Sequence, residues 1–305
     1  MKSKETSKKS VKKNYNRQLY AMLVLPVIYL VLFCYKPMLG VVIAFKKFNI
    51  FAGMWESQWV GLQHFKEAFA SSVFWNALKN TLILNLGDII LGFPIPIILA
   101  ILLNELNSSY IKKLTQVVLY LPNFLSWVII SGIVIQLCSA GGLINNIFQG
   151  LGGSTIDFLG SPFKWRLVYW FAGIWQGAGY SLIIYLAALS GTDPSLGEAA
   201  YIDGAARMKR ILHVTVPQIR GTITIMLIMQ MGKIVSIGFE RPYMLGNTLV
   251  KDVSEVISTY VYSVGLQSAR FDFATAIGLF QSVVGIALIL FVNAIAKRLG
   301  EEGII

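Results

Sequence analysis

A chain of 305 residues that is 55% hydrophobic and only 13% charged is too apolar for a soluble globular domain. Its mean hydropathy of +0.64 indicates an integral membrane protein. Two cysteines, Cys34 and Cys138, lie within or at the ends of apolar runs, where a free thiol behaves as a small hydrophobe. With His64 and His213 far apart in the chain, neither a disulfide framework nor a metal site is predicted.

Six apolar segments are long enough to cross a bilayer as α-helices, because about 30 Å of hydrocarbon needs roughly 20 residues. The sequence therefore predicts an all-α, polytopic membrane protein with six transmembrane helices. The predicted spans are 19–44, 81–103, 115–137, 167–189, 221–239 and 273–296.

The N-terminal tail carries seven of the 26 basic residues and runs directly into the first apolar segment. No small-residue cleavage site closes that segment, so we expect a retained signal anchor. A cytoplasmic flank that obeys the positive-inside rule explains the tail better than nucleic-acid binding, and no nucleic-acid partner is predicted. The predicted organisation is a basic tail at 1–18, one transmembrane domain at 19–298 and a tail at 299–305.

With both termini in the cytoplasm, six spans also place the loops 104–114 and 190–220 on that side. Cations lie close to the membrane ends of these regions, as the positive-inside rule requires. They are Lys112, Lys113, Arg207, Lys209, Arg210, Arg220, Lys297 and Arg298. The opposite segments, 45–78, 138–166 and 240–272, are predicted to be extracellular, and the predicted interfacial anchors there are Trp55, Trp59, Trp75 and Trp165.

Residues 198–217, EAAYIDGAARMKRILHVTVP, lie in the largest predicted cytoplasmic loop. Ser195 and Glu198 have the spacing of a capping box, which predicts that a short helix starts there. Gly204 is predicted to end or bend this helix, and Pro217 marks the run into the fifth span. Small residues give the helix a nearly bare face that another protein's backbone can approach: Ala199, Ala200, Gly204, Ala205 and Ala206.

This stretch resembles the EAA loop of the inner-membrane permeases of ABC importers. The pattern of that loop is Glu-Ala-Ala, three residues, Gly, nine residues, then Ile-x-Leu-Pro, and the matching positions are Glu198, Ala199, Ala200, Gly204 and Pro217. Asp203, Gly204 and Ala205 supply the Asp-Gly-Ala common in sugar permeases, whereas Val214 and Val216 replace Ile and Leu. The segments VGLQHFKEAF, VFWNALKNTLIL and GFERPYMLGN extend the resemblance to the MalF-like carbohydrate branch and its LplB-like oligosaccharide and polysaccharide permeases.

The resemblance implies a type I ABC importer permease fold in which the short helix is a coupling helix that docks on a cytoplasmic ATPase. No G-x-x-x-x-G-K-[ST] sequence is present, so the chain is expected to bind no cofactor and catalyse no reaction. ATP and Mg would be used by the partner. The implied partners are a second, non-identical permease, two ATP-binding cassette subunits, an extracellular solute-binding protein and an oligosaccharide.

Positions that contact sugar in this family, aligned from the loop, fall on or near six residues of the fourth and fifth spans. They are Gly173, Gln176, Gly177, Tyr180, Gln230 and Lys233. Gly173 and Gly177 share one side of the fourth predicted helix with Tyr180 nearby, which opens space beside an aromatic ring and an amide. Sugars are bound by aromatic faces and by polar groups that satisfy hydroxyls. Gly177 and Tyr180 match the maltose permease pattern and the other four do not, so the cargo cannot be copied across.

Polar side chains inside a membrane are costly and usually have a function. Besides Gln176, Gln230 and Lys233, this argument singles out Asp88, Gln136 and Asn293. Packing between helices is the preferred interpretation for Gln136 and Asn293. For Asp88 and Lys233, a pore role and a structural charge pair stay equally open. The aromatic residues of the fourth span are predicted to pack or to face lipid: Trp170, Phe171, Trp175 and Tyr185.

Other functions compete with an oligosaccharide importer. An importer of the same class that carries a non-sugar solute is compatible with the loop. An ion-coupled secondary transporter would use Asp88 and Lys233 as coupling charges, but inverted repeats are not evident. An intramembrane enzyme is disfavoured because no nucleophile, paired-Asp or His-Glu-x-x-His arrangement occurs.

Overall fold

The structure is a computed structural model that describes residues 20–298, so the predicted tails 1–18 and 299–305 lie outside the described residues. The regular structure in this range is almost entirely helical. Its one sheet pairs β1 (Lys46–Lys47) with β2 (Gln58–Trp59) in antiparallel orientation. The all-α prediction is confirmed.

Within residues 20–298, five helices are long and apolar enough to cross a membrane. They are Tyr20–Phe45, Ser72–Asn104, Trp127–Gly150, Pro162–Ser190 and Phe271–Arg298. A sixth span exists if Arg207–Gln218 and Arg220–Met231, which are bent by 66°, are counted together. The labelled helices of the longer spans are α5 (Ser72–Gly87), α6 (Pro94–Asn104), α8 (Trp127–Cys138), α10 (Pro162–Ser190), α14 (Arg220–Met231) and α18 (Phe271–Arg298).

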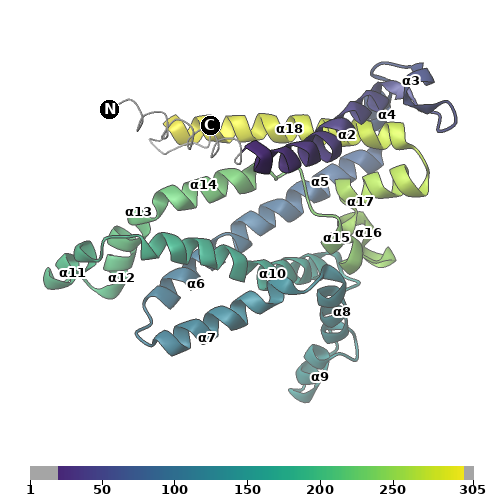
Figure 1. Ribbon diagram of the computed structural model, residues 1–305. Helices are drawn as coiled ribbons and strands as arrows, with labels where there is room; N and C mark the ends of the chain where they lie inside the picture. Colours follow the sequence, from purple (N-terminus) through teal and green to yellow (C-terminus); the bar gives the residue numbers. More distant parts are fainter. Residues whose placement is uncertain (1–19, 299–305) are drawn as a thin grey trace, which may run out of the picture.

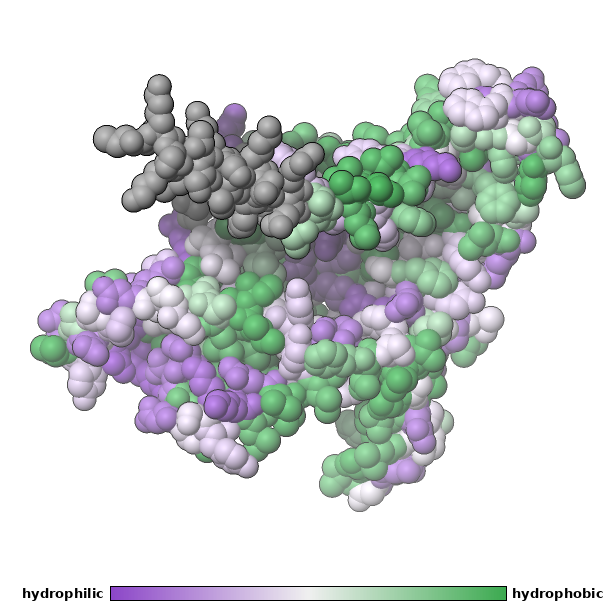
Figure 2. Space-filling model, viewed as in Figure 1, coloured by the Kyte–Doolittle hydropathy of each residue, from purple (hydrophilic) through white to green (hydrophobic). Residues whose placement is uncertain are grey.

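Shorter helices gather at the two ends of these long ones (Figure 1). At one end, here called the α11 end, lie α11 (Pro194–Ile202), α12 (Arg207–Arg210) and α13 (Val216–Gln218). The opposite end, here called the α3 end, carries α3 (Gly53–Glu56), α4 (Gln63–Ala70), α15 (Glu240–Leu245), α16 (Lys251–Ser254) and α17 (Ile257–Tyr262). Hydrophilic residues gather over α11 and α12, and hydrophobic residues cover α8 (Figure 2).

The third predicted span, 115–137, is wrong as a single helix. It is divided between α7 (Ser109–Tyr120), a short 3-10 turn (Leu121–Phe124) and α8. Pro122 lacks the N–H that an α-helix would need at this position, and the Ser126 hydroxyl then caps α8 by accepting from the Ile129 amide. The helix that follows, α9 (Leu143–Gly150), continues this span beyond the predicted end.

Buried aromatic residues hold α10 in place at the α3 end. Trp165 is 1% exposed, and its indole N–H donates to the Leu245 carbonyl of α15 at 2.8 Å. Its predicted role as an interfacial anchor is therefore wrong, because it belongs to a core cluster with Tyr169. The other three predicted anchors, Trp55, Trp59 and Trp75, are between 50% and 70% exposed.

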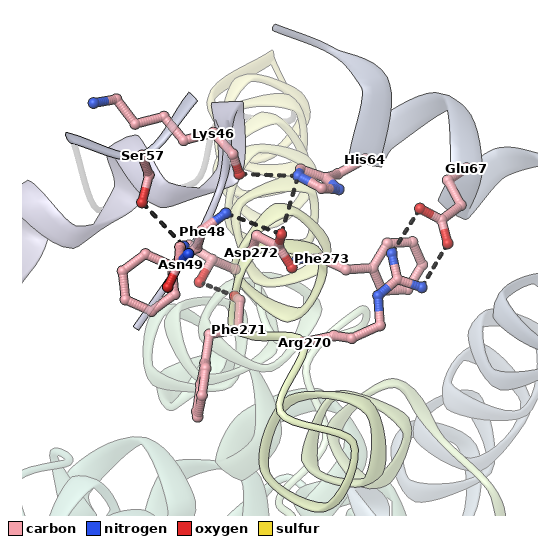
Figure 3. A network of polar contacts seen from close by, with 11 residues as sticks. Lys46, Phe48, Asn49, Ser57, His64, Glu67, Arg270, Phe271, Asp272 and Phe273 are labelled. Carbon is pink, nitrogen blue, oxygen red and sulfur yellow. Dashed lines mark hydrogen bonds and ion pairs between the residues drawn. The ribbon is translucent and has the colours of Figure 1, made fainter. Parts of the chain in front are cut away.

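At the α3 end, the segment after the first span is fastened to the start of α18 (Figure 3). The Phe48 amide donates to the Asp272 carboxylate at 3.2 Å, and His64 Nε2 lies 3.5 Å from the same oxygen. His64 Nε2 also lies 3.0 Å from the Lys46 carbonyl. Both ring and carboxylate are nearly buried, so this contact is sheltered from solvent screening.

A second contact joins the same two regions through Glu67 and Arg270 (Figure 3). Their two hydrogen bonds, of 2.6 and 2.7 Å, form a bidentate pair. The Arg270 guanidinium beside it lowers the pKa of the Glu67 carboxyl. We refer to the Phe48–His64–Asp272 and Glu67–Arg270 contacts together as the rim clamp.

Candidate functional site

A cavity of about 900 Å³ lies between α5, α10, α14 and the segment 232–241. A smaller hollow of about 180 Å³ adjoins it and shares five lining residues with it: Asp88, Ser181, Met226, Gln230 and Arg241. Figure 2 shows this face hollowed between α14 and α10, with hydrophilic residues at the depth of the hollow. The polar groups are thus collected inside a largely apolar chain.

Five of the six predicted sugar-contact residues line these two spaces. Gly173 and Gly177 line the smaller one, Tyr180 and Lys233 line the larger one, and Gln230 lines both. Gln176 lines neither, although it lies on the same helix. The fold therefore brings together residues from α10 and α14 that are about 50 positions apart in the sequence; their contact with a cargo stays a prediction.

The helix of the fifth predicted span, 221–239, ends at Met231, so that prediction was too long. Residues 232–238 form turns and irregular backbone. Irregular backbone at membrane depth requires partners for its polar groups. The Asn85 side chain donates to the Ile234 carbonyl at 2.7 Å, and the Gln281 side chain donates to the Val235 carbonyl. This segment borders the cavity with its carbonyls held by α5 and α18.

Asp88 forms an ion pair with Arg241 across 153 sequence positions. Arg241 also lies over the Tyr169 ring at 3.8 Å and near the Trp127 ring at 5.6 Å from the ring centroids. Planar guanidinium groups suit such stacked, paired sites. The charge pair left open for Asp88 therefore exists, and the pair borders the cavity as well.

Arg241 was missed as a site residue by sequence reasoning. The available signal was Asp88 itself, because an acidic side chain in an apolar span needs a cation as partner. Arg241 was a candidate for that partner, since it directly follows the fifth apolar segment. Lys233, the cation considered from the sequence, has no ion pair with Asp88. Its side chain is exposed and lines the cavity.

Gly173 has a packing reason that the sequence did not reveal. A Cβ atom built at this position would lie 1.7 Å from Nη1 of Arg241 and 3.6 Å from the Asp88 carboxylate. Any side chain at position 173 would therefore force the Arg241 guanidinium out of its observed position. Gly177, one turn further along α10, has nothing within 4 Å of its Cβ direction, so it opens onto empty space.

The remaining polar and aromatic residues of the spans lie outside the larger cavity. Gln136 is exposed on α8, and Asn293 is buried in α18. The Trp170 indole donates to the Leu84 carbonyl at 3.0 Å, so this residue packs α10 on α5, as predicted. Phe171 is 72% exposed, whereas Tyr185 is buried and reaches the smaller hollow.

The predicted short helix of the 190–220 loop is present as α11, but its cap differs from the prediction. The Asp193 carboxylate caps the helix by accepting from the Ser195 amide at 2.9 Å, and Pro194 takes the first helical position. The capping box of Ser195 and Glu198 is therefore wrong. Proline is favoured at this position because its missing N–H would be unpaired anyway. The amide hydrogen bond lowers the pKa of the Asp193 carboxyl.

Gly204 ends α11, as predicted. Its φ is +77°, a left-handed conformation that favours glycine, and the following Ala205 amide donates to the Ala200 carbonyl at 3.0 Å. Glu198, Ala199 and Asp203 are exposed, whereas Ala200 and Ala205 are half-buried. The helix thus presents a face of small residues that, within residues 20–298, no other element covers fully.

Three contacts hold this loop in its conformation, and the first of them reaches another part of the chain. Arg207 Nε donates to the Glu105 carboxylate at the end of α6 at 2.9 Å. Arg210 lies over the Tyr201 ring at 5.0 Å, which joins α12 to α11. The Asp193 amide donates to the Gln218 side chain at 3.1 Å, which joins the start of α11 to α13 beside Pro217. The two ends of the loop are therefore joined to each other, and its middle is tied to the end of α6.

Within residues 20–298, no group of three or more His, Cys, Asp or Glu residues is arranged to hold a metal ion. The groups available in the cavity are an ion pair, a lysine, amides, hydroxyls and aromatic rings. They can bind and orient a polar solute but contain no evident nucleophile–base pair.

A family model described as "Binding-protein-dependent transport system inner membrane component" matches residues 68–301. The polygalacturonan/rhamnogalacturonan transport system permease protein YteP of Bacillus subtilis is 43% identical over 94% of this chain and 90% of its own length. Protein LplB of the same organism is 40% identical over 95% of this chain and 91% of its own length. A chain of a bacterial alginate ABC transporter, solved in complex with alginate pentasaccharide-bound periplasmic protein, superposes with a TM-score of 0.87. It is 38% identical, with 97% of this chain and 99% of that chain covered.

Proposed function

The chain belongs to the family of inner membrane components of binding-protein-dependent transport systems, and from this premise we propose that its cavity carries an acidic oligosaccharide. It is a multi-pass permease subunit of an ABC importer, and it forms half of the translocation pore in this proposal. The cavity between α5, α10 and α14 would be this chain's share of the path.

The chemistry of the cavity supports a sugar cargo. Tyr180 offers an aromatic face, and Gln230 and Ser181 offer hydrogen-bonding groups on the wall of the same cavity. The named cargoes of similar proteins include polygalacturonan and alginate, both acidic polysaccharides. Lys233 supplies a cation on the same surface for a carboxylate.

The exposed helix α11 supports coupling to a partner ATPase, and it is the observation on which the coupling proposal depends most. Its small residues permit close backbone approach, and Glu198 can accept hydrogen bonds or form a charge pair with the partner. The residues assigned to coupling are Glu198, Ala199, Ala200, Asp203, Gly204, Ala205 and Pro217. ATP and Mg would be bound by two ATP-binding cassette subunits, not by this chain.

The lipid-facing spans leave surface for a second permease. Only 6% of the residues in the apolar window of Tyr20–Phe45 and 11% of those in α18 are buried. We assign the remaining half of the pore to a homologous, non-identical permease, and the α3 end to contact with an extracellular solute-binding protein. We assign the α11 end and both termini to the cytoplasm, because the cations of the 190–220 loop agree with the positive-inside rule.

This proposal is tested by ATP-driven uptake in proteoliposomes that contain the chain with its partner permease, ATPase and binding protein. We expect Glu198→Ala and Ala200→Trp to lower uptake at least about tenfold, because loss of an interface hot spot costs about 2 kcal/mol or more. Lys113→Ala, an exposed charged residue on α7 outside the residues assigned to coupling, is the control and should leave uptake unchanged.

Unaltered assembly and uptake in both α11 variants would contradict the coupling role. Uptake driven by a proton or sodium gradient without nucleotide would instead establish an ion-coupled transporter. Competition between labelled trigalacturonate and the neutral sugar xylotriose measures the cargo preference in the same vesicles.

A further inference from the structure

We propose that a hollow at the α3 end, separate from the translocation cavity, is an outer carbohydrate subsite that holds part of the cargo at the pore entrance. The hollow measures about 300 Å³ and is formed by α15, α16, α17 and the π-helix Ser263–Gln267 that follows α17. We call it the tyrosine hollow after Tyr243 and Tyr262, which line it. This inference rests on the proposed function, since it requires a sugar cargo.

The aromatic wall of the hollow is held rigid. Tyr243 and Tyr262 meet edge to face, with ring centroids 5.4 Å apart, and Phe239 lies against both, at 4.6 and 4.7 Å. Tyr243 is nevertheless 43% exposed, so part of its ring remains free to accept a ligand. A fixed, partly exposed aromatic surface is what the C–H face of a pyranose ring stacks on, at little cost in side-chain entropy.

Free polar groups surround this wall. Within residues 20–298, the side chains of Lys251, Glu255 and Gln267 form no hydrogen bond or ion pair, and all three line the hollow. Together they offer an ammonium, a carboxylate and an amide, which pair with carboxylate and hydroxyl groups of a uronic sugar. The mixture of aromatic faces and such groups matches a carbohydrate better than a lipid tail, which would need an apolar wall.

The position of the hollow connects it to the cargo path. Phe239 lines the translocation cavity, and its ring is stacked on Tyr243 of the hollow. Phe239 therefore lines the cavity and also contacts both tyrosines of the hollow. A sugar chain long enough to occupy both would be held at the entrance and at the cavity together, which raises its effective concentration at the cavity.

The test uses the assembled permease and ATPase complex in lipid nanodiscs without the binding protein, with trigalacturonate as the probe. Saturation-transfer NMR should show protein contact with the sugar that falls about fivefold in Tyr262→Ala. Tyr262→Phe keeps the ring and should retain most of the signal. Tyr110→Ala, which removes a tyrosine that is 74% exposed on α7, is the matched control.

Uptake in proteoliposomes provides the second measurement. The half-saturating sugar concentration should rise severalfold in Tyr262→Ala with an unchanged maximal rate, whereas a purely structural defect would lower the maximal rate. Equal NMR signals and equal half-saturation in wild type and Tyr262→Ala would overturn this inference alone. Failure of the wild-type transporter to take up or bind either trigalacturonate or xylotriose would overturn the proposed function and the inference with it.

Discussion

Arg241 organises the polar interior of this permease subunit. Its guanidinium pairs with Asp88, stacks on Tyr169 and occupies the space that Gly173 leaves open. Removing one partner of such a pair leaves the other charge poorly solvated, which is more costly than losing the pair as a whole. The pair therefore fixes the position of α15 relative to α5 and α10 at the wall of the cavity.

Two glycines of α10 should respond in opposite ways to the same substitution. Gly173→Ala places a methyl group where Arg241 lies, and we expect the free energy of unfolding to fall by about 2–4 kcal/mol. Gly177→Ala meets open space, and the gain in helix propensity should stabilise the protein by about 0.5–1 kcal/mol. Thermal unfolding of both variants in the same detergent measures the difference. A destabilised Gly177→Ala, or an unaffected Gly173→Ala, would contradict this assignment.

At the scale of helices, the contact between Arg207 and Glu105 joins α12, which follows the proposed coupling helix α11, to the end of α6. Glu105 ends α6, and α6 leads back through the turn 88–92 to Asp88 at the cavity. These contacts connect the loop that contains α11 and α12 to the ion pair through one helix. Contact evidence of this kind defines a path, and its energetic coupling is measured by mutation.

We expect Arg207→Ala to lower sugar uptake per ATP hydrolysed about two- to fivefold, with ATP hydrolysis itself retained. The pair is partly exposed, so its contribution to stability is small, about 0.5 kcal/mol, and the effect should appear in coupling and not in folding. The exchange Arg207→Glu with Glu105→Arg should restore the ratio. Lys209→Ala, an exposed cation two residues away, serves as control; an equal loss there would refute a specific contact.

The rim clamp predicts a pH dependence of stability. The Arg270 hydrogen bonds lower the pKa of Glu67 in the folded chain, so the contribution is present above the unfolded pKa, near 4.5. It is lost as the pH falls through the lower folded pKa. Both side chains are nearly half exposed, so we expect about 0.5 kcal/mol.

Glu67→Gln should therefore lower the melting temperature slightly at pH 7 and converge with wild type near pH 3. Melting curves of the two proteins between pH 3 and 7 provide the measurement, with Glu56→Gln as the control for an unpaired acid at the same end. A constant difference across this range would show that the pair does not titrate as described.

Helices were predictable where their pattern is local. The apolar helices and α11 depend on neighbouring residues, and they are present. The end of α11 at Gly204 is local in the same way. The break at Pro122 had a local signal too, but the apolar run across it concealed the break. The unwound segment 232–238 could not be foreseen, since its carbonyls are satisfied by Asn85 and Gln281 from distant helices.

For the whole molecule, the cavity was predictable in part. Positions on α10 and α14 follow from helical spacing and family resemblance, and five of the six line the cavity or the smaller hollow beside it. The Asp88–Arg241 pair spans 153 positions, and no local pattern encodes which cation an acid meets. Likewise, Trp165 was predicted to be a membrane anchor. Its burial against Leu245 is a tertiary contact that the local sequence does not reveal.

The rim clamp also fixes an order of events during synthesis. Phe48 and Asp272 are 224 positions apart, so at roughly 5–20 residues per second the ribosome delivers the second partner roughly 10–45 s after the first. Throughout that interval the first span stands in the bilayer without α18, the helix that lies beside it at the α3 end (Figure 1). Lipid therefore covers the side of that span that later meets α18, and the rim clamp can close only after residues 270–272 have been made.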